Sequence, residues 1–218
     1  MKKRLIIALL LLVLLSTYKP QKLFLSTQLN IDEIEIENNF ILKEAYIKKE
    51  LNFLYQTNLI FLKNSEIKNV LKQIDFIESF EIKKIYPKKL KIRIYEKKPI
   101  AILQYKRKKF YINKNIDLIN YIYLEEFKDL PLVFSDKKNF KSLYINLKKI
   151  NFPLDLIAKY YLYESKRWDL ETYKKLLIKL PPENYTKSLK NFMKLVKNNS
   201  FEKYKIFDYR INNQLILK

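Results

Sequence analysis

Residues that could do catalytic chemistry are few in this 218-residue chain, because histidine, cysteine and glycine are all absent. This absence excludes a Ser-His-Asp or Cys-His relay, a His/Cys zinc site and a glycine-dependent phosphate-binding loop. Glu125 and Glu126 could in principle serve a glycosidase, but adjacent residues on a strand point to opposite faces. Asp208 and Arg210 share one strand face and could be either a structural ion pair or a functional pair. Most common enzyme chemistries are therefore excluded, and we expect no catalytic residues, no metal and no cofactor.

The charge of the chain is strongly positive, with 44 Lys and Arg against 23 Asp and Glu and a formal net charge of +21. Nearly all of these cations are lysine, although arginine is the residue that binds bases and phosphates through paired hydrogen bonds. Lysine, isoleucine, asparagine, phenylalanine and tyrosine have A/T-rich codons, so a biased genome explains both their abundance and the missing glycine. We therefore expect no nucleic-acid partner, and nucleic-acid binding is the weaker alternative.

The N-terminus has a basic tail, residues 1–4, followed by eleven unbroken apolar residues from Leu5 to Leu15. Eleven residues is nearer the length of a signal-peptide core than of a spanning helix, which needs about 20. No small-residue cleavage site follows, so either a short uncleaved anchor or a signal peptide with an atypical site fits the sequence. We favour the anchor, with residues 1–4 as a cytoplasmic tail and residues 5–25 as a transmembrane anchor and juxtamembrane segment.

Residues 29–98 alternate between strand and helix patterns. Glu33–Glu37 and Leu90–Tyr95 each have the two-residue period of a half-buried strand. The i, i+3, i+4, i+7 spacing of an amphipathic helix is present at Ile67, Val70, Leu71 and Ile74. The segment predicts a strand, two helices and two further strands, which form a small two-layer domain.

After Pro99 the pattern becomes mostly β. Short apolar runs predict a series of strands, including a pair at 161–168 and 174–180. We expect helices at about 153–160 and after Pro182. The predicted fold class is therefore α+β, with an N-terminal anchor, a β-α-α-β-β domain at 29–98, and a mostly antiparallel β domain at 99–218 with a helix near its C-terminus.

Several motifs together resemble the FtsQ/DivIB family of bacterial cell-division proteins, whose members have a short cytoplasmic tail, one membrane span, a POTRA domain and a β domain. Ile85–Ala101 follows the family's R-x-Y/W-P-x-x-L-x-I-x-V-x-E-R-x-P-x-A run almost position for position, with Lys97 at the usual arginine. Ile34–Asn38 is similar to the I-x-V-x-G-N opening of the POTRA domain. Leu130-Pro131 resembles the LP that precedes a glycine in relatives. The signatures of α-proteobacterial members are resembled by Arg167–Leu170, Leu180-Pro181 and Asp208–Arg210.

The resemblance implies a scaffold of the cell inner membrane at the division septum, with its N-terminus cytoplasmic and its bulk periplasmic. It implies FtsB-like and FtsL-like bitopic partners, other divisome components as further candidates, and no small-molecule substrate. In the family a partner adds a strand after the D-x-R motif, and an uncovered terminal strand does leave backbone groups for another strand to satisfy. The contacts carried over to this sequence are Tyr209, Arg210, Ile211, Asn213, Leu215 and Leu217, with Trp168 as aromatic support. A second docking edge is expected on the POTRA strand at Leu90, Ile92, Arg93, Ile94 and Tyr95.

Two other functions fit the sequence less well. One is another POTRA-containing membrane or secretion component. The other is a secreted basic protein that binds lipid, glycan or nucleic acid, which would show steeply salt-dependent binding.

Overall fold

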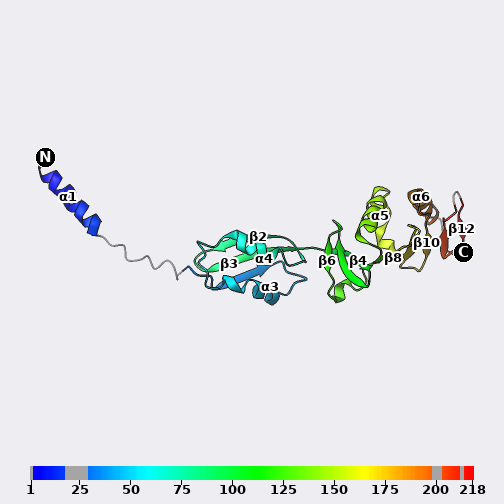
Figure 1. Cartoon of the computed structure of the whole chain (residues 1–218), viewed down its shortest axis with the longest axis horizontal. Helices are drawn as coiled ribbons and strands as arrows, with labels where there is room; N and C mark the ends of the chain where they lie inside the picture. The colour runs from blue at the N-terminus through cyan, green and yellow to red at the C-terminus, as the bar shows by residue number, and fades with distance from the viewer. Residues whose placement is uncertain (1, 18–28, 198–202, 212–213) are drawn as a thin grey trace. The chain divides into compact units, whose positions relative to one another are not determined.

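The computed structural model describes residues 2–17, 29–197, 203–211 and 214–218. The chain divides into two compact units, Met1–Glu96 and Lys97–Lys218. We describe each unit by itself (Figure 1).

The first unit contains a three-stranded sheet with two helices. Its elements are α1 (Lys2–Thr17), β1 (Glu33–Glu37), α3 (Glu44–Glu50), η1 (Asn52–Leu54), α4 (Asn64–Leu71), β2 (Ile77–Ile85) and β3 (Lys89–Glu96). The order from β1 onward confirms the predicted strand, two helices and two strands. Apolar positions of β1, β3 and α4 are buried together, as the alternating and helical periods require; they include Ile34, Ile67, Leu71 and Ile92.

The helix α1 covers the apolar N-terminal stretch. None of the described helices is both long enough and apolar enough to cross a membrane. The expected anchor at 5–25 falls only in part on α1, because its remainder from residue 18 lies outside the described residues.

The strand β3 is not an edge, contrary to the prediction of a docking edge at Leu90–Tyr95. The sheet order is β1-β3-β2, so β3 is the central strand. It pairs with β1 in parallel and with β2 in antiparallel fashion, so both sides of its backbone are used within the sheet. A partner strand cannot add to β3 while this sheet is intact.

The second unit is built on a nine-stranded sheet in the order β12-β11-β10-β9-β8-β7-β4-β5-β6. Its first strands and turns are β4 (Pro99–Tyr105), β5 (Lys108–Asn113), β6 (Leu118–Asn120), η2 (Glu125–Phe127) and β7 (Leu132–Phe134). Next come α5 (Lys137–Lys149), η3 (Leu154–Leu156), β8 (Ile157–Leu162), β9 (Trp168–Thr172) and β10 (Leu177–Lys179). The unit ends with α6 (Tyr185–Leu195), β11 (Ile206–Asp208) and β12 (Ile216–Leu217).

This sheet is mixed: most of its neighbouring pairs are antiparallel, as expected, but three are parallel. β4 and β7, β7 and β8, and β10 and β11 pair in parallel. Two of these pairs follow from the helices, since α5 connects β7 to β8 and α6 connects β10 to β11, and parallel neighbours need such crossovers. The sequence analysis assigned no helix to 137–149 and placed one at about 153–160, where the chain instead makes η3 and enters β8.

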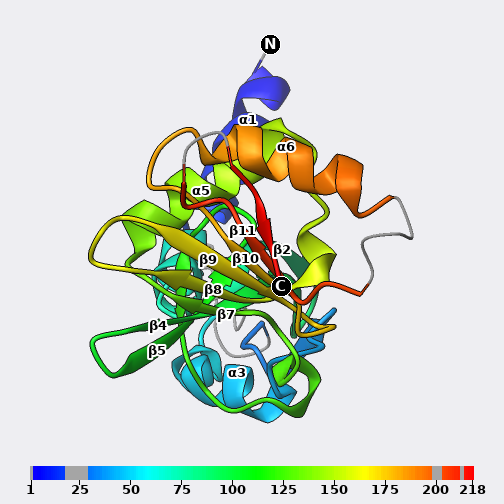
Figure 2. The same ribbon diagram turned by 90° about the vertical axis from the view of Figure 1, so that its right-hand side faces the viewer.

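The core lies on one face of the nine-stranded sheet. Residues directly opposite one another on neighbouring strands share a face, and one row of them is apolar from β12 as far as β4. It contains Leu217, Phe207, Ile178, Leu170, Tyr160, Val133 and Leu103. Both α5 and α6 lie on this face (Figure 2) and contribute side chains such as Phe140 and Phe192 to the same core.

Candidate partner-binding edge

The strand β12 forms the C-terminal edge of the nine-stranded sheet. It pairs with β11 through Phe207 opposite Leu217 and Asp208 opposite Ile216. Lys218 donates its N–H to the carbonyl of Ile206 at 3.1 Å and accepts the N–H of Ile206 at 2.9 Å. None of the described strands pairs with the outer side of β12. This side therefore presents main-chain groups that a further strand can use.

The hydrogen-bonding direction alternates along β12, as in any antiparallel pair. Because Lys218 bonds to β11, the N–H and C=O of Leu217 point away from β11, toward the open side. The side chain of Leu217 packs partly buried against the core, whereas Ile216 is 38% exposed on the opposite face. Position 217 thus offers its backbone to a partner, and position 216 offers an apolar side chain.

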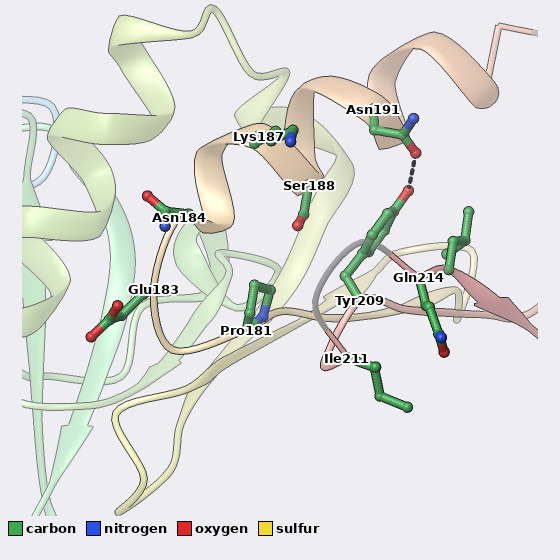
Figure 3. Close-up of a pocket in the computed structure, with 10 residues that line it drawn as sticks. Pro181, Glu183, Asn184, Lys187, Ser188, Asn191, Tyr209, Ile211 and Gln214 are labelled. Atoms are coloured by element: carbon green, nitrogen blue, oxygen red, sulfur yellow. Dashed lines mark hydrogen bonds between the residues drawn. The ribbon is translucent and has the colours of Figure 1, made fainter.

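A pocket of ≈ 680 Å³ adjoins this edge, between α6 and the segment that leads into β12 (Figure 3). Its wall is formed by Pro181, Glu183, Asn184, Lys187, Ser188, Asn191, Tyr209, Ile211, Gln214 and Leu215. The hydroxyl of Tyr209 donates to the side-chain oxygen of Asn191 at 3.0 Å and links β11 to α6. Burial raises the pKa of Tyr209, so the phenol stays a neutral hydrogen-bond donor.

The opposite face of the sheet carries a row of charges beside the same edge. Asp169, Lys179 and Asp208 lie across from one another on β9, β10 and β11. Arg210 holds Asp208 with its Nε at 2.9 and 3.0 Å and its Nη2 at 2.6 Å from the carboxylate oxygens. Arg167 donates its Nε–H to Asp169 at 3.1 Å.

These charges differ in how their surroundings affect their protonation. The hydrogen bonds from Arg210 hold the pKa of Asp208 below its ordinary value. Burial raises the pKa of Asp169, and the nearby Arg167 offsets only part of that effect. Arg210 is therefore already engaged by an ionised carboxylate, which makes Asp208 and Arg210 a structural ion pair.

The other predicted contacts fall into different environments. Trp168 is only 5% exposed and belongs to the core of the second unit. Ile211 is exposed at the mouth of the pocket, whereas Leu215 is partly buried. Asn213 lies outside the described residues. The sequence analysis missed Ile216, although the alternation that turns Leu217 inward requires the residue before it to face outward.

The predicted POTRA contacts are occupied within their own sheet. Leu90, Ile92 and Ile94 are buried in the core. Arg93 pairs with Glu37 at 3.1 Å, and Tyr95 donates its hydroxyl to Glu81 at 3.0 Å. Five ion pairs between β1 and β3 continue along this face and join Glu33, Glu35 and Glu37 to Lys89, Lys91 and Arg93.

Comparison with known proteins supports this architecture. Residues 29–97 match the POTRA domain of FtsQ type. The chain is 28% identical over 192 residues to the cell division protein FtsQ of Rickettsia typhi, which covers 86% of this chain and 72% of the relative. Residues 29–97 are thus similar to an FtsQ-type POTRA domain, and most of the chain is similar to FtsQ cell division proteins. The cell division protein FtsQ of Agrobacterium fabrum is 23% identical over 167 residues, 76% of this chain and 53% of that protein.

A solved structure is also similar in part. The major extracytoplasmic domain of the trans isomer of the cell division protein DivIB from Geobacillus stearothermophilus matches with a TM-score of 0.33 and 12% identity. The match covers 50% of this chain and 98% of that domain.

Two segments that are separate in the sequence lie close together in the nine-stranded sheet. Arg167–Leu170 leads into β9, and Asp208–Arg210 ends β11, with only β10 between the two strands. The shared neighbour Lys179 contributes to the electrostatic surroundings of both aspartates. The folded chain thus brings the two segments within one strand of each other, on the inner side of β12.

Proposed function

We propose that this FtsQ/DivIB chain is a non-enzymatic scaffold of the division machinery that binds small bitopic partners by strand addition at β12. The observation that carries the proposal is the outer side of β12, which none of the described strands covers. An added strand would take its main-chain hydrogen bonds from Leu217 and pack a side chain beside Ile216. FtsB-like and FtsL-like proteins are the partners that the family resemblance implies.

The pocket beside the edge supports the same binding mode. Strand addition gains affinity from the main chain and specificity from pockets that take alternate side chains. This pocket is lined by amide, hydroxyl and charged groups, such as Asn184, Ser188 and Lys187, as well as by Ile211. We infer that it accepts a polar or acidic side chain of the partner, next to the added strand.

The proposed location is the inner membrane at the septum, with the N-terminus cytoplasmic and the two folded units outside the cytoplasm. The supporting features are the basic residues 2–4 and the eleven apolar residues that follow them. The segment then acts as a single-pass anchor that retains the scaffold beside membrane-bound partners.

A pull-down of the tagged full-length chain from its own membranes tests this function. In mild detergent, we expect mass spectrometry to identify small bitopic coiled-coil proteins together with septal wall synthases. Recovery of outer-membrane barrel components, or of nothing above background, would contradict the scaffold. Binding that disappears with moderate salt and follows lipid or nucleic acid would instead favour a basic secreted binder.

A truncation in the same assay tests the binding mode. Deleting residues 211–218 removes β12 and one side of the pocket, and leaves the first unit unchanged in sequence. We expect the truncated chain to lose its small partners and to keep the protease resistance of the POTRA domain. Retention of the partners would show that they bind elsewhere.

A further inference from the structure

One end of the POTRA sheet is where the chain enters the domain. The segment 29–32 is fixed there by neighbours on two sides. Leu59 donates its N–H to the carbonyl of Leu29 at 2.8 Å, and Asp32 donates its N–H to the carbonyl of Lys88 at 3.0 Å. The loop before α4 and the turn between β2 and β3 therefore lie beside the entering chain.

The loop before α4 is held in a defined shape. Leu62 donates its N–H to the carbonyl of Asn58 at 3.0 Å, and Ile60 donates its N–H to the side-chain oxygen of Asn58 at 2.9 Å. Lys84 donates from its ammonium group to the carbonyl of Leu62 at 2.8 Å and ties the loop to the end of β2. Side chains carried by this loop are thus presented on a fixed support.

Large apolar side chains project into solvent at this end. Phe61 is 78% exposed, Ile60 is 49% exposed, and Tyr86 in the neighbouring turn is 57% exposed. These side chains belong to segments that are bonded to one another through Lys84 and Leu62. A folded domain gains nothing from exposing three such groups together, so they indicate a contact surface.

Cations surround the apolar side chains. Lys63 follows the loop directly and is exposed, and Lys88 follows the turn. The one carboxylate bonded there, Asp32, is neutralised by Lys88 at 2.7 Å. Aromatic and aliphatic side chains beside lysines are the composition that binds the surface of an anionic bilayer. We call Ile60, Phe61, Lys63, Tyr86 and Lys88 the entry-end patch.

The connection to the N-terminal helix indicates which surface the entry-end patch contacts. The patch adjoins Leu29, and residues 18–29 can reach at most about 43 Å even when fully extended. The apolar N-terminal helix therefore keeps the patch close to whatever that helix inserts into. We propose that the entry-end patch docks on an anionic lipid surface and seats the POTRA domain on the membrane. This inference rests on the membrane anchoring proposed above.

The opposite end of the same domain provides a matched control. Phe40 is 82% exposed, close to the value for Phe61, but its N–H is donated to Glu96 at the last position of β3. Phe40 thus lies at the end where the chain leaves the POTRA domain. The chain contains no cysteine, so single-cysteine variants can be labelled at chosen positions.

Fluorescence quenching in vesicles tests the proposal on the full-length chain. Phe61→Cys, Phe40→Cys and Leu10→Cys variants are labelled with the environment-sensitive dye NBD. They are reconstituted in vesicles of phosphatidylethanolamine and phosphatidylglycerol that contain nitroxide-labelled lipid. We expect quenching of the Phe61→Cys probe to be at least about twofold stronger than quenching of the Phe40→Cys probe. The Leu10→Cys probe reports anchoring by the N-terminal helix independently.

The possible outcomes separate the two proposals. Quenching at positions 10 and 61 but not 40 supports both. Quenching at 10 with equal signals at 61 and 40 keeps the anchor and overturns the docking patch. Quenching of the probe at position 61 but not of the probe at position 10 supports the docking patch and overturns the anchor. If neither probe is quenched, both proposals are overturned. A blue shift at 61 without lipid quenching assigns the patch to a protein and overturns lipid docking.

A charge variant tests the preference for anionic lipid. Lys63→Gln removes one exposed cation of the patch and leaves the loop hydrogen bonds in place. In the Phe61→Cys background we expect it to lower the ratio of docked to undocked patch about fivefold on vesicles with phosphatidylglycerol. On vesicles of phosphatidylcholine alone we expect no change. Equal effects on both vesicles would overturn the electrostatic part of the proposal.

Discussion

The central strand of the POTRA sheet and the last strand of the chain use their backbones in opposite ways. β3 is hydrogen-bonded on both sides, to β1 along Lys89–Arg93 and to β2 along almost its whole length. β12 is short, pairs with β11 on one side, and has no described strand on its outer side. The first strand is closed to an added strand, and the second is open.

A strong sequence motif does not by itself mark a surface that is free to bind a partner. The best-matching family run, Ile85–Ala101, contains the most enclosed strand of the POTRA domain. Within that run, Glu96 accepts the N–H groups of Phe40, Ile41 and Leu42 at 2.9, 2.8 and 2.8 Å. The residues of this run therefore contribute to the stability of the POTRA domain. The open edge lies in a region with weaker motifs.

The largest expected effect concerns the core beneath the open edge. Phe207 on β11 is fully buried, and its ring meets that of Phe192 on α6 at a centroid distance of 5.1 Å. Phe207→Ala should lower the free energy of unfolding of the second unit by about 3–5 kcal/mol. Trp168, the single tryptophan, lies in the same core and reports this unfolding by fluorescence in urea. An unshifted Trp168 transition would show that the edge is not supported by this core.

The corresponding change in the closed region is Glu96→Ala. It leaves three N–H groups of the 40–42 segment without their carboxylate, which should lower the stability of the POTRA domain by about 2–3 kcal/mol. Far-UV circular dichroism and hydrogen exchange of β1 and β3 measure this loss. Because Trp168 belongs to the other unit, its transition should stay in place. Equal shifts of both transitions would contradict two separately stabilised units.

A smaller effect is expected from pH at the charge row. Because the pKa of Asp169 is raised in the folded state, the folded state binds a proton at this carboxylate at a higher pH than the unfolded state does. Its contribution to stability therefore increases as pH falls from neutral toward the ordinary aspartate pKa. The lowered pKa of Asp208 gives the opposite sign, because its contribution is present above the ordinary value and is lost as pH falls through the lowered one.

Two variants resolve these contributions in urea titrations followed by Trp168 fluorescence. Asp169→Asn should remove the gain on mild acidification and leave the acid loss. Asp208→Asn should reduce the loss at lower pH and leave the gain. An unchanged pH profile in both variants would mean that neither carboxylate affects stability in the way described.

The smallest effect is expected on the exposed face of the POTRA sheet. Lys91 bridges Glu35 at 3.4 Å and Glu37 at 2.6 Å. Its hydrogen bond is the main cause of the lowered pKa of Glu37, whereas the hydrogen bond from Lys89 is the main cause of the lowered pKa of Glu35. These groups are accessible to water, and exposed ion pairs contribute little. Lys91→Gln should therefore shift the thermal transition less than Glu96→Ala. The shift that Lys91→Gln causes relative to the unmodified chain should vanish in about 1 M salt, where the screening length is about 3 Å.

Much of the POTRA fold follows from the sequence because its periods are unambiguous. The alternation in Glu33–Glu37 and the helical spacing from Ile67 to Ile74 each allow one burial pattern only. The same signal was present and unused at Phe140, Leu143, Tyr144 and Leu147, which form the buried stripe of α5. That helix could have been predicted.

Other features depend on long-range pairing that local patterns do not encode. The period of β3 identifies a strand but does not say whether its neighbours lie on one side or both. The parallel pairing of β10 with β11 joins residues about thirty positions apart in the sequence. The pocket lined by Asn191 and Tyr209 forms only because that pairing brings α6 and the end of β11 together, so no local pattern indicated it.

The most direct test of the account is a proline at the open edge. Leu217→Pro removes an N–H that points away from β11 and so costs no hydrogen bond within the sheet. Leu217→Ala removes the same side chain and keeps the N–H, and Trp168 fluorescence verifies that both variants fold. We expect full-length Leu217→Pro to capture the small bitopic partners about tenfold less well than Leu217→Ala. Equal capture by the two variants would contradict strand addition at β12.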